Sequence, residues 1–303
     1  MLVSIIVILK IIARMLRSDL TLSYDKSNKL FSKFVEKSNI RNLVFEPYIL
    51  SPTPALQGII YLICEITLNK ISPTPFEQEL VTLPDGGTCG LAWDGGIPTK
   101  EDPLTKPLLI ICPGLGGGSQ NLYSLALLWK ARAAGYKIVT VLFRGAEGIP
   151  ITTAKLSYSG SWEDVQTCLE YIDKKYVRDP KTQKRRTRVY IFGVSLGANI
   201  LGLYLGKAGE KAKYYLDAAL LYATPWSIKN GSKFFYENFY GLYQKIIGLN
   251  LNNTIKTTQL PKFKELMSEE DFKWVSNAID TNKTGLDHID KHIYVKMFGY
   301  KDV

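Results

Sequence analysis

The residues of this sequence best suited by type and spacing to catalysis are a serine and the glycines that flank it. Gly193, Ser195 and Gly197 form a G-x-S-x-G pattern directly after the apolar run 189–192. A good helix-forming stretch, residues 198–205, follows, so the segment predicts a strand, a sharp turn and a helix. Such a turn needs glycines because its backbone is strained and crowded. We interpret it as a nucleophile elbow that presents the Ser195 hydroxyl; an ordinary strand-to-helix turn of a doubly wound protein is the alternative.

A glycine-rich loop lies upstream of the serine. The unbroken apolar run 108–112 predicts a buried parallel strand, which leads into Pro-Gly-Leu-Gly-Gly-Gly-Ser at residues 113–119. A loop of this kind can cradle a phosphate, but a P-loop ends in Gly-Lys-Ser/Thr and a dinucleotide site requires a suitably spaced acid. Neither pattern is found in this sequence, so an oxyanion-binding loop or a flexible turn remains.

The elements around both motifs alternate regularly. Residues 76–93, split by Pro84-Asp85-Gly86-Gly87, predict an antiparallel hairpin. Strands are predicted over 108–112, 136–143, 188–194 and 216–223, with helices over about 119–134, 161–176 and 196–208. This pattern predicts an α/β fold, a mostly parallel sheet with helices on both faces. Residues 227–303 read as a helical lid, with a capping box at residues 268–271, and residues 55–64 as a short helix.

Composition bounds the class of protein. With 303 residues, of which 46% are hydrophobic and 22% charged, the chain can fold as a large α/β domain. Its four cysteines form no CxxC pair and no zinc-ligand spacing, which fits a reducing compartment. His288 and His292, four residues apart, can share a helix face and hold a metal, but no third ligand accompanies them. We therefore expect solvated lid residues, no metal and no cofactor.

The net charge of +10 includes a dense basic run before the serine motif, made of Lys174, Lys175, Lys181, Lys184, Arg185, Arg186 and Arg188. The run is interpreted as a solvated loop. Attraction to an anionic membrane surface is the functional alternative. Binding of nucleic acid is disfavoured because no nucleic-acid motif accompanies the charge.

The first 17 residues are apolar but carry Lys10 and Arg14. A membrane-spanning helix needs about 20 predominantly apolar residues, so the segment is short for that task. It also lacks the basic start and small-residue cleavage site of a signal peptide. A membrane-associating segment, either a short anchor or an interfacial helix, is the interpretation; a buried helix is the alternative.

Taken together, these motifs resemble the α/β-hydrolase superfamily, in the branch of medium-chain fatty acid ethyl ester synthase/esterases and monoacylglycerol or phospholipid lipases. Beside the serine motif, the matching segments are Leu83-Pro84-Asp85-Gly86-Gly87 with Trp93, Pro113-Gly114-Leu115, Phe143-Arg144-Gly145, Tyr158-Ser159-Gly160 with Asp164, and Phe298-Gly299-Tyr300. The resemblance implies an α/β-hydrolase fold in which residues 1–17 associate with a membrane, 18–80 form an extension, 81–226 the core and 227–303 the lid.

The resemblance also implies a chemistry. Ser195 would be the nucleophile for a carboxylic ester, and the N–H groups of Leu115 and Leu196 would stabilise the oxyanion. The expected substrate is a lipid acyl ester, with no cofactor, and the expected location an intracellular membrane.

One departure concerns the catalytic acid and base. Family members continue into two more strands, which carry an aspartate and the catalytic histidine, whereas this sequence stops at Val303. The expectation is a sheet without its last two strands and an incomplete triad, as in a truncated gene product that is inactive as given, because a serine hydroxyl needs a base. A non-catalytic, hydrolase-like protein that binds a lipid or a partner is the alternative.

Overall fold

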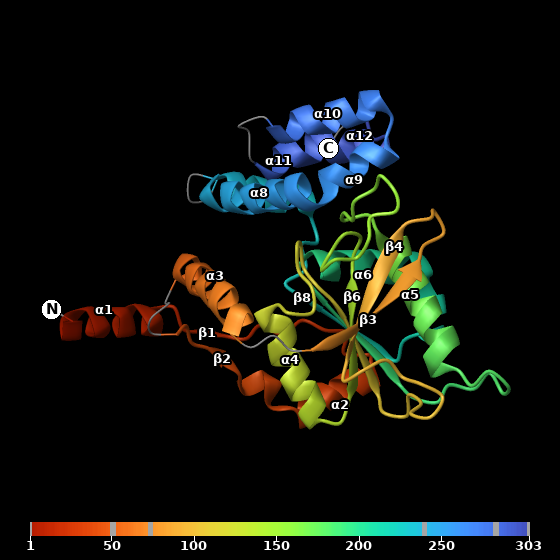
Figure 1. Cartoon of the computed structure of the whole chain (residues 1–303). Helices are drawn as coiled ribbons and strands as arrows, with labels where there is room; N and C mark the ends of the chain where they lie inside the picture. Colours follow the sequence, from red (N-terminus) through yellow and green to blue (C-terminus); the bar gives the residue numbers. More distant parts are fainter. Residues whose placement is uncertain (1, 49–52, 72–74, 238–240, 281–284, 302–303) are drawn as a thin grey trace. The chain divides into compact units, whose positions relative to one another are not determined.

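The computed structural model describes residues 2–48, 53–71, 75–237, 241–280 and 285–301. The chain divides into two compact units, Met1–Ser72 and Pro73–Val303 (Figure 1). The second unit holds both the serine motif and the glycine-rich loop.

The first unit is mainly helical. Its elements are α1 (Leu2–Met15), β1 (Ser18–Asp19), α2 (Lys29–Lys37), a 3-10 turn (Asn39–Asn42), β2 (Val44–Phe45) and α3 (Pro54–Ile71). β1 and β2 pair antiparallel, and the Asn28 side chain caps α2 by accepting the Phe31 N–H at 3.0 Å. α1 covers most of the apolar N-terminal segment, and α3 extends the helix predicted at 55–64. In the part of the chain that the structure describes, no helix is long and apolar enough to cross a membrane.

The second unit is built on a six-stranded sheet. Its strands are β3 (Phe76–Thr82), β4 (Thr88–Asp94), β5 (Leu108–Cys112), β6 (Lys137–Leu142), β7 (Val189–Val194) and β8 (Ala218–Tyr222), in the order β3-β4-β6-β5-β7-β8. β3 and β4 form the predicted antiparallel hairpin, and β4 is also antiparallel to β6. β6, β5, β7 and β8 run parallel to one another. The predicted strands are therefore confirmed, with shifts of one or two residues at their ends.

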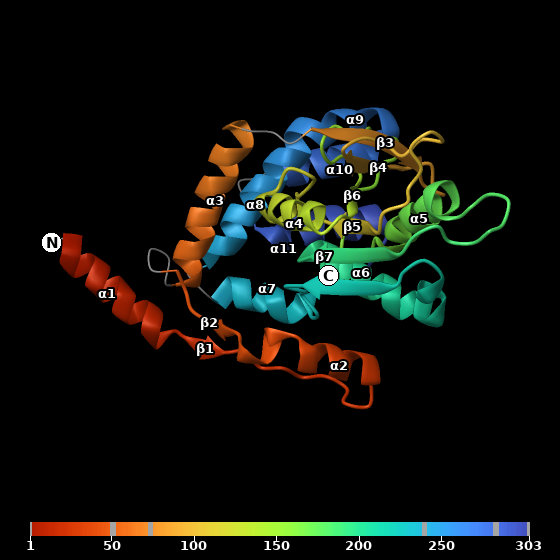
Figure 2. The same cartoon turned by 90° about the horizontal axis from the view of Figure 1, so that it is seen from below.

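Helices cover both faces of this sheet, because successive side chains of a strand point to opposite faces. They are α4 (Leu122–Ala133), α5 (Trp162–Ile172) with a π-helical turn (Asp173–Val177), and α6 (Leu196–Ala208) with a 3-10 turn (Gly209–Tyr214). Ile111 of β5 packs with Leu128 of α4, whereas its neighbour Ile110 belongs to the core that contains α5 and α6. Figure 2 shows α4 and α6 on opposite sides of β5 and β7.

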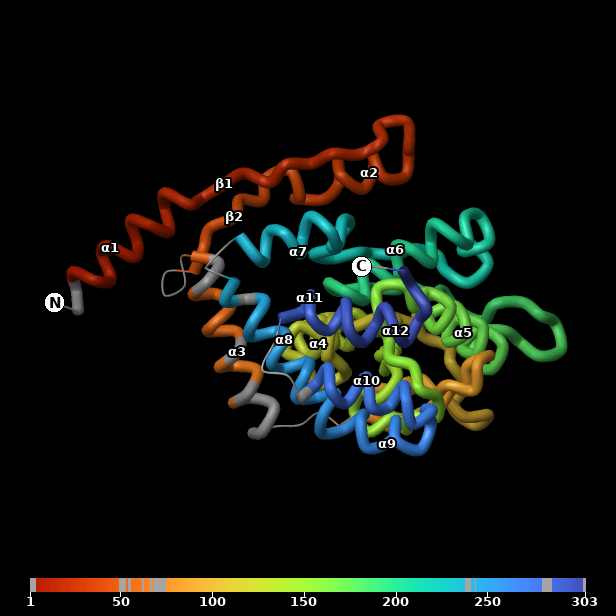
Figure 3. The backbone as a smooth tube through the Cα atoms, turned by 90° about the horizontal axis from the view of Figure 1, so that it is seen from above, coloured from red at the N-terminus to blue at the C-terminus, as the bar shows by residue number. Residues whose placement is uncertain are grey.

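The described residues of the C-terminal segment of this unit are helical, as the sequence predicts, and the segment is called the lid below after the role expected for it. Its elements are α7 (Ile228–Glu237), α8 (Leu242–Thr254), a π-helical turn (Ile255–Gln259), α9 (Leu260–Leu266), α10 (Glu269–Asp280), α11 (Leu286–Ile289), a second π-helical turn (Asp290–Tyr294) and α12 (Val295–Phe298) (Figure 3). The lid has its own apolar core around Phe263, Val275 and Ile293, joined by Leu156 from the loop after β6. Ser268 caps α10 by accepting the Asp271 N–H at 3.1 Å.

Two segments singled out in the sequence, residues 158–160 and 298–300, meet where the lid contacts the core. The ring of Tyr158 stacks on Phe298, with centroids 4.0 Å apart, and its hydroxyl lies 2.7 Å from that of Tyr300. The Leu156 N–H also donates to the Met297 sulfur at 3.2 Å. The loop after β6 thus contacts the last helix of the lid by ring stacking and hydrogen bonds.

Candidate active site

Ser195 occupies a strained, exposed turn between β7 and α6. Its φ of 51° and ψ of −117° lie outside the regions that a side-chain-bearing residue usually adopts. A conformation of this kind costs about 1–3 kcal/mol and persists only where the surroundings enforce it. Here the Ser195 N–H donates to the Tyr222 carbonyl at 2.9 Å, which pins the turn to the end of β8. The strand–turn–helix geometry predicted for this motif is present.

The two glycines of the motif have no space for a side chain. A Cβ atom on Gly193 would lie 2.7 Å from the Cα of Ala198. One on Gly197 would lie 2.3 Å from the carbonyl oxygens of both Cys112 and Pro113. These contacts are with backbone atoms, which cannot move aside easily. Both glycines therefore allow α6 to start directly against β5 and β7.

The glycine-rich loop lies beside Ser195 because of strand register. β5 and β7 are parallel neighbours and Cys112 pairs with Gly193, so the segments that follow leave the same edge of the sheet together. A Cβ on Gly114 would lie 3.3 Å from the Cβ of Ser195. The structure thus brings together the two segments that the sequence analysis selected separately.

Two backbone N–H groups beside this serine are open. The Gly114 N–H donates to the Tyr123 hydroxyl at 3.0 Å, and the Gly117 N–H to the Gly114 carbonyl at 2.9 Å. By contrast, the N–H groups of Leu115 and Leu196 have no acceptor among the residues that the structure describes. Leu196 is also the first residue of α6, where the helix dipole favours negative charge. An arrangement of this kind can bind the oxyanion of an acyl-transfer intermediate.

A buried ion cluster supports the loops around the site. Arg144, which follows β6, donates to Asp164 of α5 at 2.7 and 2.8 Å and to Asp85 of the β3–β4 turn at 2.9 Å. Burial works to raise the pKa of Asp85, but the hydrogen bonds from Arg144 outweigh it and lower that pKa to about 2. The cluster joins three motifs that lie far apart in the sequence.

Both histidines of the sequence lie in the lid. His288 is in α11 and His292 in the π-helical turn after it, and their ring centroids are 4.5 Å apart. The Nε2 atom of His288 lies 2.8 Å from the Ala278 carbonyl oxygen, so this ring is hydrogen-bonded within the lid. Among the described residues, no group of three or more His, Cys, Asp or Glu side chains is placed to hold a metal ion.

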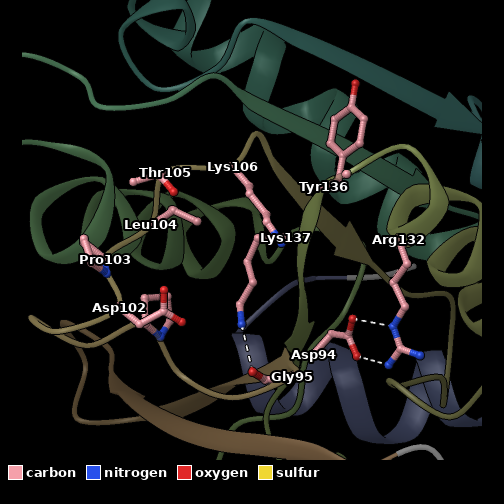
Figure 4. A pocket seen from close by; sticks show the side chains of 12 residues that line it. Asp94, Gly95, Asp102, Pro103, Leu104, Thr105, Lys106, Arg132, Tyr136 and Lys137 are labelled. Carbon is pink, nitrogen blue, oxygen red and sulfur yellow. Dashed lines mark hydrogen bonds and ion pairs between the residues drawn. The ribbon is translucent and has the colours of Figure 1, made fainter.

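A cavity of about 390 Å³ lies at the opposite end of the parallel strands from Ser195 (Figure 4). It is lined by Lys137 and Arg132, among others, at the amino-terminal end of β6, whereas Ser195 follows the carboxyl-terminal end of the parallel strand β7. Arg132 pairs with Asp94, and the Lys137 ammonium donates to the Gly95 carbonyl at 3.1 Å. These cations already have partners within the protein, and the cavity is separate from the serine site.

Sheet order, the strained serine and the adjoining glycine-rich loop define the class of structure, which is the α/β-hydrolase fold. No protein-family model matches it. Proteins similar to it in sequence include ones named as an esterase, a phospholipase and a lipase. It is 28% identical over 209 residues to the embryogenesis-associated protein EMB8 of Picea glauca, covering 66% of this chain and 43% of that protein.

Two further relatives carry enzyme names. The chain is 29% identical over 157 residues to phospholipase ABHD3 of Homo sapiens, covering 51% of this chain and 36% of the relative. It is 28% identical over 210 residues to the monoacylglycerol lipase of Saccharomyces cerevisiae, covering 68% of this chain and 43% of the relative. The chain therefore spans less than half the length of each of these three relatives.

Proposed function

We propose that this protein has the site of a hydrolase of carboxylic esters, specifically lipid acyl esters, which works through an acyl intermediate on Ser195 when a base is supplied. The observation that carries the proposal is the strained, exposed serine beside two open N–H groups. In the proposed reaction the Ser195 oxygen attacks the ester carbonyl, and the N–H groups of Leu115 and Leu196 bind the resulting oxyanion. During the attack a base takes the Ser195 hydroxyl proton, and it returns a proton to the alcohol as the ester C–O bond breaks. Water, deprotonated by the same base, then hydrolyses the acyl-serine.

Exposed aromatic side chains at the end of β8 and shortly after it favour an acyl substrate. Tyr222, whose carbonyl accepts the Ser195 N–H, is 61% exposed, and Trp226 four residues later is 76% exposed. Surface of this kind can bind a fatty acyl chain. A phospholipase and a monoacylglycerol lipase among the relatives support the same substrate class.

The attack requires a base, and neither histidine of the sequence is an evident one, since both belong to the lid. This observation favours a second candidate function, in which the fold binds a lipid or a partner without turnover. Reaction of Ser195 with a fluorophosphonate separates the two, because the reaction needs an activated serine and an oxyanion site.

We expect the 303-residue chain to be labelled slowly or not at all by the fluorophosphonate alone. Added imidazole, which can act as a diffusible base, should increase the labelling rate at least about tenfold, because general-base catalysis contributes 10²–10⁴ when the base is positioned. Ser195→Ala should abolish labelling. A folded chain that stays unlabelled with imidazole contradicts the esterase and favours the binder. Rapid labelling without imidazole would instead show that the chain supplies its own base.

We further propose that residues 1–17 associate with a membrane surface. In α1, Ile5 and Ile8 are about half exposed, and Lys10 and Arg14, four residues apart, share another face. Apolar and basic faces on one helix suit the headgroup boundary of a bilayer. The basic run at 174–188 is less suited to membrane binding because it lies before β7, at the opposite end of that strand from Ser195. Arg185 and Arg186 within it pair with Asp217 and Asp179.

A further inference from the structure

The Tyr123 hydroxyl forms a hydrogen bond at the centre of the glycine-rich loop. Tyr123 is in the first turn of α4, and its hydroxyl accepts the Gly114 N–H at 3.0 Å. Gly114 is the loop residue that faces Ser195, since a Cβ on it would lie 3.3 Å from the serine Cβ. A single hydroxyl thus contacts the loop one residue before Leu115.

The loop also closes around this hydroxyl from its other side. A Cβ on Gly117 would lie 2.5 Å from the Tyr123 hydroxyl oxygen and 3.0 Å from the Gly114 carbonyl oxygen. The Gly117 N–H donates to that same carbonyl at 2.9 Å. Leu115 and Gly116 therefore span a tight turn whose two ends both rest on Tyr123. Because peptide units are planar, fixing both ends leaves the Leu115 N–H few directions.

We propose that Tyr123 is a positioning residue for the esterase reaction proposed above, on which this inference rests. By accepting the Gly114 N–H, its hydroxyl occupies that donor and leaves the Leu115 N–H as the loop's donor to the oxyanion. A misdirected donor loses most of its effect, because an oxyanion site works through donors already aimed at the developing charge. Tyr123 acts on the reaction through the loop, whose Gly114 N–H it accepts.

Glu147 holds the far end of the same loop. Its carboxylate accepts the Ser119 hydroxyl at 2.7 Å and the Gln120 N–H at 3.3 Å. Glu147 has a φ of 45°, a costly conformation for a residue with a side chain. The three glycines at 116–118 between these contacts have no side chains of their own to restrain them. The loop therefore depends for its order on hydrogen bonds from other residues, those of Tyr123 and Glu147 together with those that Asn121 and Ser124 form with Gly118.

Tyr123→Phe tests the proposal by removing one oxygen atom. The matched control is Tyr204→Phe on α6, because the buried Tyr204 hydroxyl has no hydrogen-bond partner among the described residues. The substrates are p-nitrophenyl octanoate and its thionoester, with imidazole present as base. Oxyanion donors bind a developing oxygen anion better than the larger, weakly accepting sulfur, so the ratio of ester to thionoester rates reports the oxyanion site.

We expect Y123F to lower kcat on the ester about tenfold, less than the 10²–10³ lost when an oxyanion donor itself is removed. KM should stay unchanged and the ester-to-thionoester ratio should fall, while Y204F matches the wild type in both. Hydrogen exchange of residues 113–119, followed by mass spectrometry, should become faster in Y123F alone. If Y123F does not fold, the same comparison is made in a Gly206→Ala background, which stabilises α6.

An unchanged kcat, or equal slowing of ester and thionoester, overturns the proposal. Absence of any Ser195-dependent turnover in the wild type is a failure of the proposed function, and hydrogen exchange then decides the inference. Faster exchange of residues 113–119 only in Y123F supports positioning by Tyr123, and unchanged exchange overturns it.

Discussion

The carbonyl oxygen of Cys112 lies where a side chain on Gly197 would have to be, 2.3 Å from its Cβ position. The end of β5 and the first turn of α6 are thus in direct backbone contact. That contact places the glycine-rich loop and the serine turn side by side, so the site depends on a glycine that takes no part in the chemistry.

Gly197→Ala should therefore destabilise the fold by about 3 kcal/mol, the upper end of the usual range for overpacking, because the atoms it meets are backbone oxygens. Gly206→Ala is the matched control on the same helix, since nothing lies within 4 Å of its Cβ position. There alanine should stabilise by about 0.5–1 kcal/mol, owing to its better helix propensity. Urea denaturation measures both, and equal behaviour of the two variants would contradict the close approach at Gly197.

Backbone strain at Ser195 predicts an unusual stabilising substitution. Glycine adopts a positive φ without the steric cost, so Ser195→Gly should be more stable than Ser195→Ala by about 1 kcal/mol, after allowing for the flexibility of glycine in the unfolded chain. Neither variant should react with the fluorophosphonate. Thermal denaturation of the two proteins checks the order, and a more stable alanine variant would show that the turn is relaxed.

Local sequence patterns predicted the architecture well, and the physical reason is the periodicity of apolar residues. The run at 108–112 and the glycine spacing at 193–197 are contiguous, so both motifs could be recognised without knowledge of contacts. The sequence predicts a start of α4 at about 119, which is too early, because the segment up to Asn121 is a loop held by side-chain hydrogen bonds; the Gly118 N–H, for example, donates to Asn121.

Contacts between distant side chains could not be predicted in this way. Asp85, Arg144 and Asp164 belong to three separate motifs, and only the fold brings their charges together. Tyr123 gave no signal at all, because an aromatic residue in the first turn of a helix ordinarily packs in the core. The assigned pair of oxyanion donors and the nucleophile remain predictions from the motif, to be tested by the experiments above.

Removal of the Arg144 side chain should be among the most damaging single changes. Arg144→Ala leaves Asp164, whose side chain is 7% exposed, as a buried charge without its partner, a change that typically costs about 3–5 kcal/mol. Arg186→Ala breaks the exposed pair with Asp179 and should cost less than about 1 kcal/mol. Urea denaturation at neutral pH compares them.

The same cluster predicts that the free energy of unfolding of the wild type decreases at acid pH; this decrease is called the acid limb below. Asp85 has a lowered pKa of about 2 in the folded protein, against an ordinary value of 3.8. The unfolded chain therefore takes up the proton first, and the stabilisation is lost as the pH falls from about 4 to 2. In Arg144→Ala this limb should be weaker, and an unchanged acid profile would contradict the assignment to Asp85.

Asp290 should make the stability of the lid decrease as the pH rises, which is the opposite of the dependence expected from Asp85. Burial, together with the negative charge of Asp287, raises the pKa of Asp290 to about 6. The folded lid thus binds this proton more tightly than the unfolded chain does. The contribution of protonated Asp290 to the stability of the lid is therefore complete below about pH 4 and is lost as the pH rises through 6. Asp290→Asn should slow hydrogen exchange of residues 285–301 at pH 8 and change it little at pH 4, after correction for intrinsic rates. Equal protection of the wild-type lid at both pH values would contradict this prediction.

Membrane association is predicted to depend on residues 2–17. Deleting them should move the protein from the pelleted to the soluble fraction after sedimentation with vesicles that contain anionic lipid, because the exposed isoleucines of α1 supply the apolar contact. Ile8→Glu, a single change on that face, should weaken binding in the same direction, whereas Lys10→Glu should do so mainly at low salt, where headgroup charge is poorly screened. If the deletion leaves the distribution unchanged, the anchor proposal fails, and the basic run at 174–188 becomes the surface to test, by the dependence of binding on salt.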